Sequence, residues 1–99
     1  MEKTPDLSTF YKAVLSIKNE EECKIFFEDI CTIKELETML QRLDVARMLL
    51  DGKTFNEIVS VTGASTTTIS RVNRCLRYGD GGYKLVADNL RNLDKQHKN

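Results

Sequence analysis

The chain has 99 residues, of which 40% are hydrophobic, and equal numbers of acidic and basic residues give it no net charge. This length suits one domain, residues 1–99, with a modest core, so burial against a second copy would add stability. No apolar run approaches the ~18 residues of a membrane span and no secretory signal opens the chain, which favours a cytoplasmic protein.

The N-terminal third predicts two short amphipathic helices. Apolar residues at three- and four-residue spacing indicate a helix over about residues 5–18, which Thr4 can cap and whose first turn Pro5 fits. A second helix is expected after Asn19, because residues 20–22 are glutamates, which favour the positive end of a helix dipole. Each helix has one apolar stripe, which is typical of packing on one side.

A long helix and a short helix are expected next. Residues 32–35 form a capping-box pattern that opens a helix from Ile33 to about Asp51, with Gly52 as a natural stop. A second capping box, residues 54–57, opens the short helix. The turn that follows contains a glycine, which permits the left-handed backbone of a sharp reversal.

The last third predicts a fifth helix, a glycine-rich break and a sixth helix. Ser65 can cap the fifth helix, and residues 79–82 form the break. A sixth helix is expected over about residues 83–94, followed by a polar, frayed tail. No alternating strand pattern appears, so the fold class is all-α. The fifth helix has one inward-facing apolar side: Ile69, Val72 and Leu76.

This fifth helix has the composition of a DNA-reading element. Residues 66–77 contain no acidic residue, and their N-terminal end offers short hydroxyls that can approach base edges in a major groove. Arginines on one stripe can reach phosphates or guanines, and the helix N-terminus itself favours a phosphate. We therefore interpret residues 54–77 as a helix-turn-helix. The candidate contacts on its second helix are Thr66, Thr67, Thr68, Ser70, Arg71, Arg74 and Arg77.

The neutral net charge hides an uneven distribution. Residues 1–40 contain nine acidic and five basic residues, whereas residues 41–99 contain six acidic and ten basic ones. The basic excess therefore lies in the half that carries the proposed DNA-reading helix, although a solvated surface can show the same pattern.

A different function remains open at this point. The hydroxyls at the helix start need have no role beyond capping the helix. The arginine stripe would then bind an acidic protein, and the chain would be a helical dimeric protein-interaction module. The hydroxyls argue against this alternative, because protein contacts do not need them and more often use aromatic anchors.

Catalysis and metal binding are not expected. Cys23, Cys31 and Cys75 are odd in number and widely spaced, and the single histidine, His97, lies in the polar tail. We interpret the cysteines as reduced, partly buried thiols, with no metal site and no cofactor. No Ser-His-Asp set, phosphate loop or paired-carboxylate motif appears, so no catalytic residue is assigned.

Several segments resemble one known superfamily. Residues 63–71 (Gly-Ala-Ser-Thr-Thr-Thr-Ile-Ser-Arg) are similar to the turn and recognition-helix start of the tryptophan repressor superfamily. Residues 49–53 resemble the end of its long central helix. The match is closer to its TrpR-related YerC/YecD family, of which residues 77–83 are also characteristic. The resemblance covers roughly residues 7–95.

This resemblance implies an intertwined homodimer of six-helix chains. Its dimerisation core would be residues 5–51 and 83–94, and its two helix-turn-helix heads would lie one helical turn apart on a palindromic operator. The implied function is a sequence-specific transcription regulator of double-stranded DNA, a repressor by analogy. By position in the family, Thr66, Thr67 and Ser70 would face bases, and Thr68 and Thr54 would lie near phosphates.

The family's ligand pocket is where this chain departs from the pattern. Thr32, Arg42 and Arg71 match pocket positions, but Val72 replaces a glycine against which an indole lies and Cys75 replaces a serine that helps hold an amino group. Filling space that the ring needs costs on the order of 1–3 kcal/mol. We expect that free tryptophan is not a corepressor, and that Val72 fills the pocket or another small effector binds the two arginines.

Overall fold

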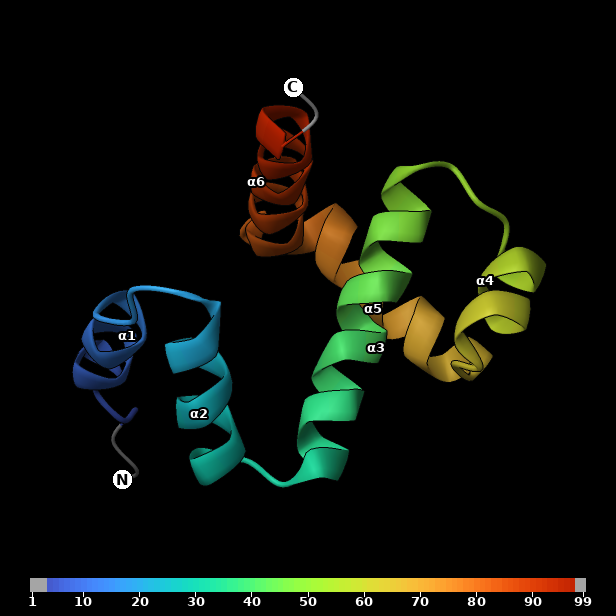
Figure 1. The fold of residues 1–99 in the computed structure, drawn as a ribbon. Coiled ribbons are helices and arrows are strands. Elements are labelled where there is room, and N and C mark those ends of the chain that lie inside the picture. Colours follow the sequence, from blue (N-terminus) through green and yellow to red (C-terminus); the bar gives the residue numbers. More distant parts are fainter. Residues whose placement is uncertain (1–3, 98–99) are drawn as a thin grey trace. The chain divides into compact units, whose positions relative to one another are not determined.

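Within residues 4–97, which the computed structural model describes apart from the side chain of His97, the chain forms six α-helices and no strand (Figure 1). This confirms the all-α prediction. The helices are α1 Ser8–Leu15, α2 Glu20–Ile30, α3 Ile33–Leu50, α4 Phe55–Thr62, α5 Thr66–Tyr78 and α6 Gly82–His97. None of these helices is long and apolar enough to cross a bilayer. The chain divides into two compact units, residues 1–36 and 37–99.

The N-terminal unit contains α1, α2 and the first turn of α3. Aromatic rings connect its two short helices: the Phe10 and Phe26 ring centroids lie 6.3 Å apart, and Phe26 meets Phe27 edge-on at 5.3 Å. Such pairs stabilise by about 0.5–1.5 kcal/mol beyond the area that they bury. No residue of α1 or α2 is fully buried, so much of their apolar surface is exposed.

The predicted start of α1 is wrong. Thr4 does not cap this helix and Pro5 does not lie in its first turn, because the helix begins only at Ser8. The Asp6 carboxylate instead accepts a hydrogen bond from the Ser8 backbone N–H at 3.0 Å. This local bond competes with an earlier helix start, and it lowers the pKa of Asp6 because it favours the ionised form.

Two helix ends also differ from the prediction. α1 stops at Leu15, where the Ser16 hydroxyl donates to the Ala13 carbonyl at 2.6 Å and competes with the helical ladder. α6 continues to His97 instead of ending near Asp94. The polar composition that suggested a frayed tail is therefore compatible with a solvated helix.

Three helices begin where the sequence predicts, each directly after a capping side chain. In each case a side-chain oxygen accepts a hydrogen bond from the backbone N–H three residues on, at 2.9–3.2 Å. Each cap satisfies a donor that the helix leaves free. The capping residues are Asn19 for α2, Thr54 for α4 and Ser65 for α5. Gly63 ends α4 with φ +71°, the left-handed conformation that the sequence predicts.

A small apolar cluster holds the C-terminal unit together. Its buried members are Val45 and Ala46 on α3, Ile58 on α4, Ala64 in the turn, and Ile69 and Val72 on α5. At this cluster α5 crosses α3, as Figure 1 shows. Leu76 packs against its edge, so the predicted inward side of α5 is confirmed. We call these six buried residues the head cluster.

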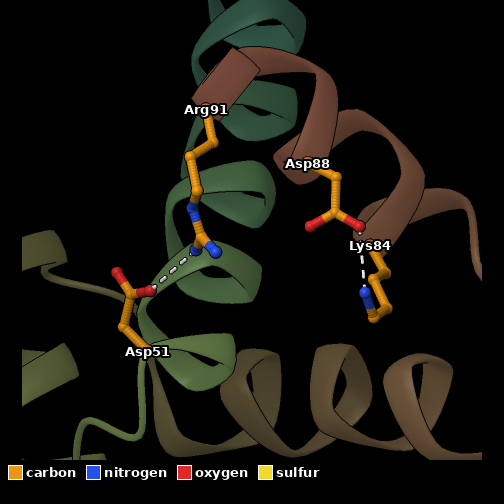
Figure 2. Close-up of polar contacts among 4 residues, drawn as sticks. All are labelled: Asp51, Lys84, Asp88 and Arg91. Carbon is orange, nitrogen blue, oxygen red and sulfur yellow. Dashed lines mark hydrogen bonds and ion pairs between the residues drawn. The ribbon is translucent and has the colours of Figure 1, made fainter. Parts of the chain in front are cut away.

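An ion pair joins α6 to the end of α3. Figure 2 shows the Arg91 guanidinium directed at Asp51, with an Nη2–Oδ1 distance of 3.3 Å. A second pair, Lys84 Nζ and Asp88 Oδ2 at 2.9 Å, lies along α6 itself. Solvent screens both exposed pairs. Ala87 on the same helix is buried, with 5% exposure.

The head cluster predicts which apolar truncation is costly. Ile69→Ala removes a side chain that is fully buried, so we expect it to lower the free energy of unfolding by about 2–5 kcal/mol. Val61→Ala is the matched control, because Val61 is 73% exposed, and its effect should stay within about 0.5 kcal/mol. Urea unfolding at one fixed protein concentration measures both, and equal losses would contradict the cluster's role.

Candidate nucleic-acid interface

Helix α5 separates a buried side from an exposed side. Ile69 and Val72 lie in the head cluster, with 0% and 3% exposure. The remaining candidate contacts project from the other side of the helix and are exposed: Thr66, Thr67, Ser70, Arg71, Arg74 and Arg77. Every one of these side chains can donate a hydrogen bond, and no carboxylate interrupts them.

The candidate residue Thr68 has a different environment. Its side chain is half-buried, and its backbone N–H donates to the Ser65 hydroxyl oxygen at 3.1 Å. The Ser65 hydroxyl in turn donates to Thr68 Oγ1 at 3.1 Å. Thr68 is therefore part of the cap of α5, which fixes the end of the helix where short hydroxyls gather.

The arginines of α5 are not used inside the described structure. Among residues 4–97, the guanidinium groups of Arg71, Arg74 and Arg77 form neither an ion pair nor a hydrogen bond. An arginine without an internal partner retains all its donors for a phosphate or a guanine edge. The exposed side of α5 is thus positively charged, and its guanidinium donors are available to a ligand.

A hydrogen bond that sequence reasoning missed fixes the turn before α5. Gln41 Nε2, on α3, donates to the Thr62 carbonyl at 3.2 Å. The Thr62 hydroxyl donates to the Ile58 carbonyl at 2.7 Å and accepts from the Ala64 backbone N–H at 3.1 Å. No local sequence signal predicts the contact from Gln41, because it joins residues 21 positions apart.

A small cavity lies beside α5. Its volume is about 120 Å³, and its lining residues are Arg42, Thr68, Arg71, Val72, Cys75 and Tyr83. It therefore brings together four of the five predicted effector-pocket residues: Arg42, Arg71, Val72 and Cys75. Sequence reasoning did not include Thr68 or Tyr83, although Tyr83 directly follows the predicted glycine break.

The expected burial of the cysteines is corrected at one position. Cys23 and Cys31 are half-buried, as predicted, but Cys75 is exposed. On α5 it lies three residues after Val72 and outside the head cluster, so the packing that buries Val72 does not cover it. All three thiols are free, and among the described residues no group of three His, Cys, Asp or Glu side chains could hold a metal ion.

Thr32, the fifth predicted pocket residue, belongs to the N-terminal unit and caps α3. Its hydroxyl accepts from the Glu35 backbone N–H at 3.1 Å, and the Glu35 carboxylate accepts from the Thr32 backbone N–H at 2.8 Å. The predicted capping box is thus confirmed. The backbone N–H of Thr32 is the main reason that the pKa of Glu35 is lowered, and the Thr32 side chain adds to the effect.

Comparison with known proteins identifies the family. The Trp repressor protein family matches residues 5–91 of this chain. The chain belongs to the Trp repressor family. Members of this family are regulators, and the family suggests a DNA-binding regulator for this chain as well.

Three similar proteins show the extent of the similarity. The uncharacterized protein YerC of Bacillus subtilis (strain 168) is 46% identical over 91 residues, which cover 92% of this chain and 88% of YerC. The crystal structure of a TrpR-like protein from Eubacterium eligens ATCC 27750 has a TM-score of 0.82 and 48% identity, over 85% of this chain and 87% of the other. A candidate Trp repressor from Staphylococcus aureus has a TM-score of 0.82 and 42% identity, over 86% and 85% of the two chains.

The capping box of α3 predicts a pKa change. Thr32→Val removes the hydroxyl but keeps the backbone N–H, which lowers the pKa most, so the pKa of Glu35 should rise only part of the way towards its ordinary value. Because the folded-state pKa is lowered, the stabilisation is present above the unfolded-state pKa and is lost as the pH falls through the folded one. The free energy of unfolding of the variant should therefore fall less than that of the wild type as the pH is lowered. An NMR titration of the Glu35 carboxyl measures the shift, and an unchanged pKa would contradict a contribution from the Thr32 hydroxyl.

Proposed function

We propose that this chain is a dimeric, sequence-specific DNA-binding transcription regulator, and that it acts as a repressor. The observation that carries the proposal is the exposed side of α5, which presents hydroxyl and guanidinium donors without a carboxylate. The head cluster braces this helix from behind, so the donors are held in place before DNA arrives. Membership of the Trp repressor family supports the same conclusion.

Position along α5 suggests how the contacts divide. Short side chains at the N-terminal end, Thr66, Thr67 and Ser70, let the backbone approach base edges closely in the major groove. The longer arginines reach phosphates or guanines. Thr54 caps α4, and Thr68 lies in the first turn of α5 beside its Ser65 cap, so each lies at a helix N-terminus, where backbone donors favour a phosphate.

Exposed apolar residues support the dimer. Leu85, Val86 and Leu93 of α6 are 62%, 44% and 50% exposed, and Leu15, Ile25 and Ile30 of the N-terminal unit are at least half exposed. Exposed apolar surface on each of the two units is typical of a partner interface. A second copy is the partner that the family suggests, and its two-fold symmetry would match a palindromic operator on DNA.

The cavity beside α5 is a poor fit for free tryptophan. Its volume of about 120 Å³ lies well below the ~300 Å³ at which small-molecule pockets begin. Val72 is 3% exposed and packs into the head cluster, so its side chain cannot move aside without loosening α5. We propose that no tryptophan corepressor is needed, and that any effector held by Arg42 and Arg71 is smaller and anionic.

The DNA proposal makes a quantitative prediction about salt. Arg74→Ala should weaken binding to an operator fragment, and the slope of log affinity against log salt should fall by about one unit, because one phosphate contact no longer releases a counterion. Arg47→Ala, an exposed arginine on α3, is the control and should leave the slope unchanged. Fluorescence anisotropy over a salt series measures both.

Two outcomes would count against this function. A wild-type protein that retards no genomic fragment at low salt would remove its basis. Capture of a defined acidic protein that survives nuclease treatment and is lost in Arg74→Ala would favour the interaction-module alternative instead.

The corepressor prediction is tested separately. Titration of the wild-type protein with free tryptophan in a calorimeter should give no binding at micromolar strength, because Val72 occupies the space of the ring. A saturable micromolar isotherm would contradict the prediction. The same titration on Arg42→Ala would then show whether the heat comes from this cavity.

A further inference from the structure

Tyr78, the last residue of α5, is an exposed aromatic residue for which the contacts above give no role. Its side chain is 80% exposed, and none of the hydrogen bonds or ring contacts among residues 4–97 involves it. The chain leaves the helix directly after it: a Cβ on Gly79 would lie 2.5 Å from the Cys75 carbonyl oxygen, so only glycine fits this exit. The Tyr78 ring is therefore presented uncovered at the end of α5.

Helical spacing places Tyr78 on the arginine-bearing side of α5. It follows Arg74 by four residues and Arg71 by seven, and residues with these separations share one helix face. Thr67, three turns earlier, lies on the same side. This face thus offers a hydrogen-bond donor in every turn: a hydroxyl at the start, guanidinium groups in the middle and a phenol at the end.

The length of α5 determines what the phenol can reach. Twelve residue steps separate Thr66 from Tyr78, which correspond to about 18 Å along the axis. The major groove is only about 12 Å wide. When α5 enters the groove by its N-terminal end with its axis across the groove, its first turn lies at base edges and its last turn lies beyond the groove, at the level of a bounding sugar–phosphate backbone. Tyrosine is one of the side chains that contact phosphate oxygens.

We propose that the Tyr78 hydroxyl donates a hydrogen bond to a DNA phosphate and so extends the interface by one contact. The inference rests on the proposed function, because it requires α5 to bind DNA. The contact is neutral, in contrast to that of an arginine, so it stabilises the complex without releasing a counterion. It also carries no sequence information, because every nucleotide presents the same phosphate oxygens.

These properties give Tyr78→Phe a distinctive signature. Anisotropy titrations use two fluorescein-labelled 30-base-pair duplexes of unrelated sequence, each over a salt series. We expect the variant to bind both duplexes about three- to tenfold more weakly at every salt concentration, with the wild-type slope of log affinity against log salt. Arg77→Ala is the charged comparison, and its slope should fall by about one unit. Tyr11→Phe on α1 is the matched control and should bind like the wild type.

The outcomes separate this inference from the proposed function. Sedimentation and thermal unfolding accompany the titrations, and the variant should retain the wild-type mass and melting temperature. Wild-type affinity in Tyr78→Phe, a loss on one duplex only, or a changed assembly mass would each overturn the phosphate contact while leaving DNA binding intact. If the wild type binds neither duplex, the inference and the proposed function both fail.

Discussion

The packing of α5 onto α3 and α4 through the head cluster is the constraint on which the rest of the structure depends. The cluster is small, and two of its six members are alanines, Ala46 and Ala64, which allow the helices to approach closely. Ile58 and Ile69 fill the space between them and are fully buried. Because protein interiors are close-packed, a cluster of this kind leaves α5 few alternative positions. The donors on its outer side are therefore presented in a fixed arrangement.

Polar contacts around the head cluster fix the turn between α4 and α5 and the start of α5. Gly63 provides the left-handed residue that reverses the chain, and the contact from Gln41 to the Thr62 carbonyl holds the reversal against α3. Ser65 then caps α5 through Thr68. Folding has therefore already ordered α5, so binding a ligand there costs less conformational entropy than ordering the helix at that moment would.

The features that the sequence predicts correctly depend on residues close together in the chain. Caps at Thr32, Thr54 and Ser65 depend on residues three apart, so they are visible in the sequence and occur in the structure. The inward side of α5 follows from helical periodicity for the same reason. The predicted start of α1 is wrong because two local patterns compete. The hydrogen bond from the Ser8 backbone N–H to the Asp6 carboxylate forms instead of a cap at Thr4.

Contacts between distant residues lay beyond sequence reasoning. Gln41 meets Thr62, and Tyr83 joins Arg42 and Arg71 around the cavity, only because residues of four helices, α3 to α6, come together at one cluster. The four pocket residues brought together in the C-terminal unit had been identified through family resemblance, not through spacing. The exposure of Cys75 shows the same limit, since burial beside a core position depends on which neighbouring helix covers it.

The central claim is that the exposed side of α5 is the surface that meets DNA. The most direct test is an NMR titration of ¹⁵N-labelled protein with a short duplex, following every backbone amide. The account predicts that the largest shifts fall on residues 66–77 and near Thr54, while the amides of Leu40 and Val61 stay in place. Shifts concentrated on α1, α2 or α6, with α5 unperturbed, would contradict it.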